Sequence, residues 1–313
     1  MTALVRRLEQ AWFAEAPASR LAILRIVIGV YVLWYLVPRH GLLTELAESD
    51  PSLFEPVGVV SWLAHPLDPS LFHLLVIGTF AANLAFLLGW RYRISGPVFA
   101  LLLLGVLTYR NSWSMIFHSD NVLVLHVLIL GFAPAAEAVS IDSRAGDRDR
   151  TGWQYGWPIR LMCVVTVATY FLAGVAKVMG PAGWSWAGGG ELLKQVAVDG
   201  LRKDVLGSAA SPLMFALQDY LIVFTALGVG SLVMELGAPF SLIDRRLARV
   251  WAVSAFFMHW GIFFIMGITF RYQLSGVMYA PFFPLERVVV WFRSLRSGSR
   301  ATSLAEFSEA KFR

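Results

Sequence analysis

The chain has 313 residues, of which 57% are hydrophobic and 15% charged, and its mean hydropathy is +0.63. Soluble domains carry about 25% charged residues, so this composition is typical of a protein embedded in a lipid bilayer. The net charge of +5 comes from scattered basic residues rather than from one basic face, which argues against a nucleic-acid partner. The single cysteine, Cys163, excludes an intramolecular disulfide and a CxxC redox pair.

Apolar runs close to the length of a membrane-spanning helix recur along most of the chain. Residues 1–18 are predicted to form a short amphipathic segment that precedes the first span (the amphipathic lead). We interpret the run that follows as a retained span rather than a signal peptide, because no small-residue cleavage site comes after it. Eight spans are expected, at about 21–37, 71–89, 94–109, from the stretch 112–130 to Pro134, 159–179, 220–242, 250–270 and from 272, the last interrupted by Pro281 and Pro284.

The distribution of basic residues supports this topology. Of the 26 lysines and arginines, Arg25 and Lys177 lie within spans, and 18 fall on the side that would hold both termini. Such an excess follows the positive-inside rule, which predicts cytoplasmic termini. We therefore predict an all-α polytopic membrane domain over residues 1–293 and a polar cytoplasmic tail over 294–313. The six basic residues expected outside are Arg39, Arg110, Lys194, Arg202, Lys203 and Arg271.

A polar cluster opens the fourth predicted span. Ser112, His118, Ser119, Asp120 and Asn121 come directly before a strongly apolar helix. Polar groups at a membrane-helix entrance indicate either a functional site or a helix N-cap. We interpret Asp120 and Asn121 mainly as capping and orienting groups. No cap requires His118, so this histidine is predicted to be functional.

The fifth predicted span ends in a second candidate residue. Tyr170, Gly174 and Lys177 fall at i, i+4 and i+7 and so share one helical face. Ala173 and Gly174 are small enough to let a neighbouring helix approach. Lys177 is expected at the outer membrane face, at the depth of His118. It either bends its stem to the interface or is a partly desolvated amine that acts as a base.

Three further polar residues lie within predicted spans. Glu235 stands four residues before Pro239, and His259 and Arg25 are each surrounded by apolar residues. One interpretation is a catalytic polar node, and the other is a structural pair of Glu235 with Arg25 or His259 that only holds the helices together. A haem held by His126 and His259 is the remaining alternative, although nothing in the sequence singles it out. We expect no metal site.

Together these residues make the chain resemble the HTTM family, whose domain is shared with vitamin K-dependent gamma-carboxylases. The resemblance covers about residues 21–284. Its most specific pieces are Ser112-Trp113 with His118 five residues on, and the stretch from Tyr170 to Lys177 followed by Trp184 or Trp186 and Gly188. Weaker pieces are Glu235 with Pro239, and His259 followed by residues 265–270.

The resemblance implies a quinone-driven mechanism. Lys177 would deprotonate vitamin K hydroquinone or a related naphthoquinol such as menaquinol, and O2 would then convert the quinol into a strong base. That base removes a proton from the substrate, CO2 is consumed if the product is carboxylated, and His118 manages protons nearby. The polar support implied is Tyr170, Asn121, Asp120, Glu235, His259 and Arg25, and the outer-loop contacts to substrate or cofactor are Trp113, Trp184 and Trp186.

The chain also departs from the gamma-carboxylases. Only about 30 residues follow the last predicted span, where those enzymes carry a large lumenal domain, and Ala176 stands where the family often has a second lysine. We therefore expect a peptide or small-molecule substrate at the outer face of a bacterial cytoplasmic (inner) membrane. The alternative is a non-catalytic membrane subunit that supports export or maturation of a secreted peptide with a thiol-disulfide oxidoreductase partner. Transport is the weaker rival, because the sequence shows no repeated halves.

Overall fold

The computed structural model describes residues 9, 12–113, 115–143, 150–208 and 210–287. In these ranges the chain is mostly helical, and its only strands form the two-residue antiparallel pair of β1 (Ala16–Pro17) with β2 (Thr151–Gly152). The all-α prediction is therefore confirmed. The tail predicted over 294–313 and most of the predicted amphipathic lead lie outside the described residues.

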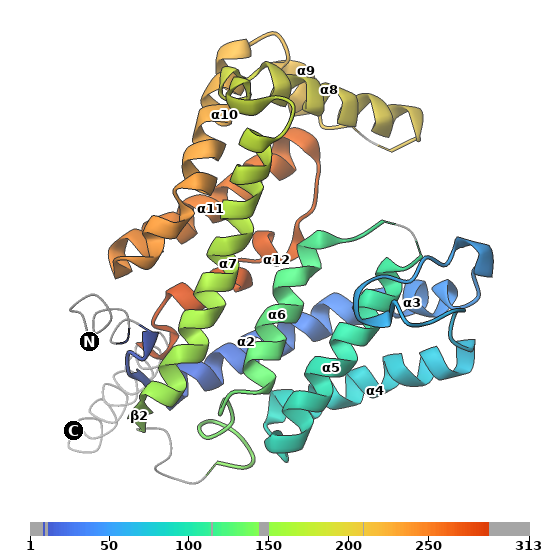
Figure 1. Ribbon diagram of the computed structural model, residues 1–313, viewed down its shortest axis with the longest axis vertical. Coiled ribbons are helices and arrows are strands. Elements are labelled where there is room, and N and C mark those ends of the chain that lie inside the picture. The colour runs from blue at the N-terminus through green and yellow to red at the C-terminus, as the bar shows by residue number, and fades with distance from the viewer. Residues whose placement is uncertain (1–8, 10–11, 114, 144–149, 209, 288–313) are drawn as a thin grey trace, which may run out of the picture.

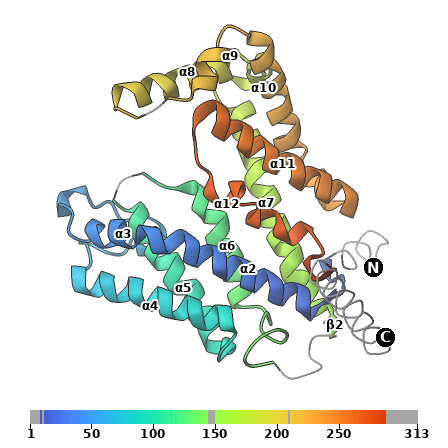
Figure 2. The same ribbon diagram turned by 180° about the vertical axis from the view of Figure 1, so that it is seen from behind.

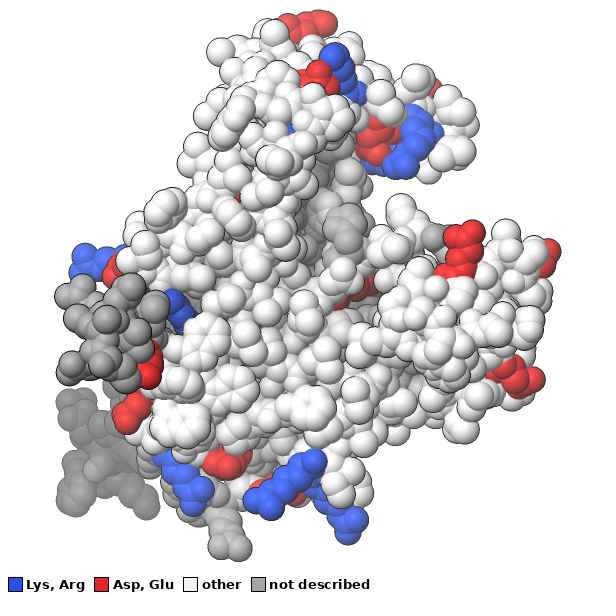
Figure 3. All heavy atoms as spheres, in the orientation of Figure 1, with Lys and Arg blue, Asp and Glu red and all other residues white. Residues whose placement is uncertain are grey.

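Five helices are long and apolar enough to cross a membrane. α2 (Ala18–Leu36) continues through η1 (Val37–Arg39) into α3 (His40–Leu46), and the others are α4 (Pro69–Leu88), α5 (Tyr92–Asn111), α7 (Trp153–Met179) and α11 (Arg245–Met266). Two shorter apolar helices, α6 (Asn121–Gly131) and α10 (Leu221–Leu236), accompany them. The five long helices match the first, second, third, fifth and seventh predicted spans, whereas α6 and α10 cover only part of the fourth and sixth. On the face shown in Figure 3 the middle of the molecule carries few charged side chains, as expected of an integral membrane protein.

The eighth predicted span is not a continuous helix. After α11 the described chain forms only α12 (Arg271–Leu274) and η8 (Val277–Phe282) before residue 285. Gly267 and Gly276 adopt left-handed backbone conformations (φ 66° and 75°), and Pro281 lies inside η8, so a regular helix cannot run through the segment. Glu286 forms an ion pair with Arg20 at 2.6 Å, which returns this broken segment to the end of the molecule where α2 begins.

The helices form two groups joined by α7. Figures 1 and 2 show α2, α4, α5 and α6 in one group, and α8 (Gly190–Val205), α9 (Pro212–Leu217), α10 and α11 in the other. α7 packs against α2 and α6 along its first part, and against α10 and η6 (Gly183–Gly188) near its end. Figure 3 shows a hollow in the molecular surface between the part around α8 and the part around α3. Of the predicted site residues, Lys177 lies at the end of α7 beside α10, and His259 lies on α11.

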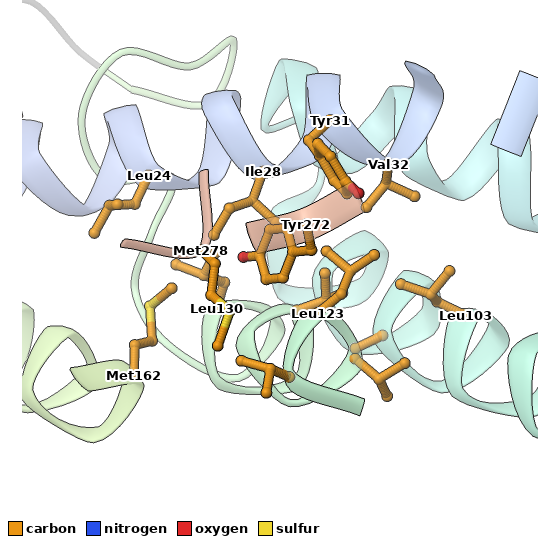
Figure 4. Close-up of a cluster of buried hydrophobic side chains, with 14 of the residues drawn as sticks. Leu24, Ile28, Tyr31, Val32, Leu103, Leu123, Leu130, Met162, Tyr272 and Met278 are labelled. Atoms are coloured by element: carbon orange, nitrogen blue, oxygen red, sulfur yellow. The ribbon is translucent and has the colours of Figure 1, made fainter. Parts of the chain in front are cut away.

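The broken segment after α11 lies in the core between three helices. Figure 4 shows Tyr272 surrounded by side chains of α2, α6 and α7, among them Ile28, Leu130 and Met162. The Tyr272 hydroxyl lies 2.8 Å from Nδ1 of His126, whose Nε2 lies 3.1 Å from Oγ1 of Thr166 on α7. Both ring nitrogens of this fully buried histidine are therefore engaged by neighbouring side chains. His126 ties α6 to α7 and α12, which leaves the haem interpretation without a free ligand on α6.

Candidate functional site

Lys177, in the last turn of α7, is paired with Glu235. Its Nζ donates to both carboxylate oxygens of Glu235, and the two side chains are 23% and 7% exposed. Glu235 lies in the last turn of α10 rather than mid-span as expected, because the helix ends at Leu236, just before Gly237-Ala238-Pro239. Lys177 is therefore a partly desolvated cation with a fixed partner, and not a lysine that extends freely to the interface.

A glycine lets the two helices meet at this pair. A Cβ added at Gly174 would lie 2.9 Å from Cβ of Glu235 and 3.1 Å from the backbone nitrogen of Leu236. Such distances leave no room for a side chain, so α7 and α10 are in contact at Gly174 because this residue has none. The predicted role of Gly174 as the point where a neighbouring helix approaches is confirmed. The contact places Glu235 one helical turn from Lys177 along α7.

We expect Gly174→Ala to destabilise the protein by about 1–3 kcal/mol, because overpacking at a helix contact forces the backbones apart. The matched control is Gly230→Ala in α10, where an added Cβ meets nothing within 4 Å. Since both substitutions gain the same helix propensity, the difference between them reports the contact alone. Thermal unfolding in detergent should give a lower midpoint for Gly174→Ala than for Gly230→Ala. Equal midpoints would contradict the close contact.

Trp186 of η6 covers one side of the lysine. Its ring centroid lies 5.2 Å from Nζ of Lys177, and its indole N–H donates to Oγ of Ser231 on α10 at 3.3 Å. η6 packs this closely on α10 because Gly228 has no side chain; a Cβ there would lie 2.6 Å from the carbonyl oxygen of Trp186. Trp186 is 7% exposed, whereas Trp184 is 71% exposed. Of the predicted outer-loop tryptophans, Trp186 is the one that contacts Lys177.

A second polar cluster lies further down the same face of α7. The Tyr170 hydroxyl is 2.5 Å from the Tyr279 hydroxyl and 3.2 Å from Nδ1 of His259, and all three side chains are buried. Nδ1 of His259 is also 3.0 Å from the carbonyl oxygen of Ala255. The ring of Phe270 contacts the His259 imidazole edge-on, with centroids 5.2 Å apart. Tyr170, Gly174 and Lys177 thus share one face, as predicted, and each of them contacts a different part of the site.

The family model of the HTTM domain matches residues 13–284. The chain belongs to the HTTM family. The match runs from just before α2 to the end of η8 and includes Lys177, Glu235 and His259. HTTM domains occur in membrane proteins related to vitamin K-dependent carboxylases. Comparison of this chain with curated proteins and with solved structures gives no match.

His118 of this HTTM domain begins η4 (His118–Asp120), and its side chain lies outside the described part of the structure. The backbone of η4 packs against α12. Phe270, which precedes α12, contacts the ring of His259. The fold therefore brings the segment that carries His118 toward the His259 cluster. A contact between His118 and Lys177 remains a prediction.

The interpretation of Asp120 as a helix cap is wrong. No side-chain hydrogen bond caps α6; the Asp120 carboxylate instead accepts from Nη2 of Arg110 at 2.7 Å and from the Tyr35 hydroxyl at 2.5 Å. Arg110 also donates to the Tyr35 hydroxyl at 2.8 Å. The Arg110 side chain is 5% exposed. Leaving a buried guanidinium without an anion costs more free energy than leaving a helix start without a cap, so Asp120 pairs with Arg110. Asn121 is the exposed first residue of α6.

Arg25 and Trp113 lie apart from Lys177 in the HTTM fold. Arg25 is fully buried and donates to the carbonyl oxygens of Ala135 and Val139, at 3.3 and 2.7 Å. The proposed structural pairs of Glu235 with Arg25 or His259 are therefore wrong. Trp113, predicted to contact substrate, is 6% exposed and packs on Phe54 and Tyr109. Within the described ranges, no group of three or more His, Cys, Asp or Glu is placed to hold a metal ion.

Sequence reasoning missed Tyr279 and Arg110. Tyr279 belongs to the broken segment around Pro281, where no helical period assigns a residue to a face. Arg110 carried a usable signal, because an arginine at the end of an apolar span needs either water or an anion and Asp120 follows ten residues later.

Proposed function

We propose that this HTTM protein is a membrane-embedded enzyme of the vitamin K-dependent carboxylase type, in which Lys177 and Glu235 handle the proton of a reduced naphthoquinone. The observation that supports this most directly is the partly buried lysine–carboxylate pair at the end of α7, with a tryptophan ring beside it. Partly buried titratable pairs of this kind are enriched at functional sites. The proposed site faces the side of the membrane that the sequence predicts to be outside.

The pair gives the lysine a way to become a base. A free ammonium in water keeps its proton at neutral pH, so a catalytic lysine needs an environment that stabilises the neutral amine. Burial disfavours both charges of the Lys177–Glu235 pair, which brings the neutral pair closer in energy to the ion pair. Transfer of one proton from Nζ to Glu235 leaves the net charge unchanged. Lys177 can then accept a proton from an acidic hydroxyl placed against it.

The surrounding side chains are of the chemical kinds that bind a flat hydroxylated ring. Trp186 presents an apolar aromatic surface next to the amine, and Tyr170, Tyr279 and His259 supply buried hydroxyl and imidazole groups below it. The chemistry that a reduced naphthoquinone supplies when bound is the formation, with O2, of a base strong enough to remove a proton from carbon. CO2 would be consumed if the substrate is carboxylated. The His259 cluster would orient polar groups and hold a proton within the membrane.

The test is quinol oxidation by the purified protein in lipid nanodiscs. We expect chemically reduced naphthoquinol and O2 to give the quinone epoxide, measured by chromatography, and Lys177→Ala to lower the rate by about 10²–10⁴-fold. The matched control is Lys194→Ala, which removes a lysine of α8 whose side chain is 72% exposed. Full activity of Lys177→Ala would rule out Lys177 as the base.

The alternative function predicts a different outcome of the same experiment. A non-catalytic subunit that supports maturation of a secreted peptide would form no epoxide with any quinol, and the Lys177–Glu235 pair would serve stability alone. Cross-linking in membranes would then be expected to capture a redox partner. Cys163 is buried, so such a partner would have to bring both thiols of its own.

A further inference from the structure

The six basic residues expected on the outer side divide into two groups. Lys194, Arg202 and Lys203 lie on α8, and each is paired with a carboxylate three or four residues away, Glu191 or Asp199. Such pairs are ordinary surface features of a helix. The other three come from separate parts of the chain and line one pocket; they are Arg39, Arg110 and Arg271. The predicted outer side of the membrane has few basic residues, and half of them line this one pocket.

The pocket has a volume of about 340 Å³ and carries excess positive charge. Asp120 neutralises Arg110. Arg39 donates to the backbone carbonyl of Tyr35 at 2.6 Å, and neither it nor Arg271 forms an ion pair with any described residue. Arg39 and Arg271 also repel each other across the pocket. Asp120 also attracts Arg39, so the three arginines of the pocket share one carboxylate among its lining residues. The excess positive charge favours an anion between Arg39 and Arg271.

An apolar groove continues from this pocket along α2. Its volume is about 710 Å³, and Thr269 and Arg271 line both the pocket and the groove. Val30 and Trp34 lie one helical turn apart on α2 and are 50% and 56% exposed. The apolar side chains that line the groove include Ile26, Val27, Val30 and Trp34 of α2, and Phe263, Leu274 and Val277 from the later part of the chain. Ile26 and Trp34 are eight residues apart on α2, which gives the groove a length of about 12 Å at 1.5 Å per residue.

We propose that the pocket and the groove form one binding site for a lipid with an anionic phosphate headgroup. The phosphate would lie between Arg39 and Arg271, where planar guanidinium groups match phosphate oxygens, with the hydroxyls of Ser119 and Thr269 alongside. One acyl chain would lie along Val30 and Trp34 of α2. A free phosphate ion would use the pocket alone. The continuity of pocket and groove through Arg271 therefore favours a lipid over a soluble anion.

The charge arm of the test is native mass spectrometry of the full chain after delipidation. We expect dioleoylphosphatidylglycerol to bind at least about tenfold more tightly than dioleoylphosphatidylcholine, and the double variant Arg39→Gln/Arg271→Gln to lose this preference. The control, Lys194→Gln/Arg202→Gln, removes the same charge from α8 and should keep it. Equal loss in the two double variants, or equal binding of the two lipids by the unchanged protein, would overturn the proposal.

The groove arm separates a lipid from a soluble anion. Val30→Trp fills the groove at a half-exposed position and should weaken binding of phosphatidylglycerol severalfold, with the melting temperature of the lipid-free protein unchanged. Inorganic phosphate at 10 mM should neither displace the lipid nor raise the melting temperature. Displacement of the lipid by inorganic phosphate, with no effect of Val30→Trp, would show a site for the free ion and contradict the lipid proposal. None of these measurements depends on quinol oxidation, so they test the lipid site independently of the proposed enzymatic activity.

Discussion

Lys177→Met is expected to lower the free energy of unfolding by about 3–5 kcal/mol and to abolish quinol oxidation. The substitution leaves the Glu235 carboxylate, which is 7% exposed, without its cation, and removing one partner of a buried ion pair is strongly destabilising. Glu235→Met should have a similar but smaller effect, because the Lys177 side chain is 23% exposed and can reach water. Denaturant unfolding in detergent measures the first effect and epoxide formation the second.

The double variant Lys177→Met/Glu235→Met separates stability from chemistry. Replacing both charges by apolar side chains of similar length removes the uncompensated charge, so stability should return to within about 1 kcal/mol of the unchanged protein. Activity should stay absent, because no amine remains beside Trp186. A double variant that is stable and still oxidises quinol would show that the pair only holds α7 against α10. It would also move the catalytic base to another residue.

The sequence predicted one face of this site because that face depends on local geometry. Tyr170, Gly174 and Lys177 recur at helical spacing on α7, and the structure places Gly174 and Lys177 against α10 and Tyr170 against His259 of α11. The partner of Lys177 could not be predicted in this way. Glu235 is 58 residues away along the chain, and the sequence offered Arg25 and His259 as equally reasonable partners for it. The contact of α7 with α10 at Gly174 brings Lys177 to Glu235 instead, and such tertiary contacts cannot be read from local sequence.

Hydropathy predicted the helical part of the fold and failed where the backbone is irregular. Apolar runs located α2, α4, α5, α6, α7, α10 and α11, since each must satisfy its own backbone hydrogen bonds. In the segment from Gly267 to Phe282, the buried residues Tyr272, Gln273 and 278–282 are covered by other helices and follow no helical period of their own. An irregular backbone is tolerated there because other parts of the protein cover it. A local sequence pattern does not predict such covering contacts. Tyr279 and its contact with Tyr170 were therefore beyond sequence reasoning.

Asp120→Asn distinguishes the two interpretations of the polar cluster before α6. Asparagine caps a helix as well as aspartate does, so the substitution would be nearly neutral if Asp120 were a cap. In the structure Asp120 is the only carboxylate paired with Arg110 among the described residues, and both side chains are at least 90% buried. Loss of the negative charge should therefore cost about 3 kcal/mol. The measurement is the free energy of unfolding in detergent.

Asp68→Asn provides the control, because Asp68 does cap a helix. Its carboxylate accepts from the backbone nitrogen of Ser70 at the start of α4, at 2.9 Å, and we expect little change in stability when asparagine replaces it. Equal behaviour of Asp120→Asn and Asp68→Asn would restore the capping interpretation. A second consequence follows from position. Asp120 fixes η4 to α2 through Tyr35 and to α5 through Arg110, so its substitution should also release the segment that carries His118. If His118 manages protons for Lys177, Asp120→Asn should slow quinol oxidation at temperatures where the protein is still folded, and Asp68→Asn should not.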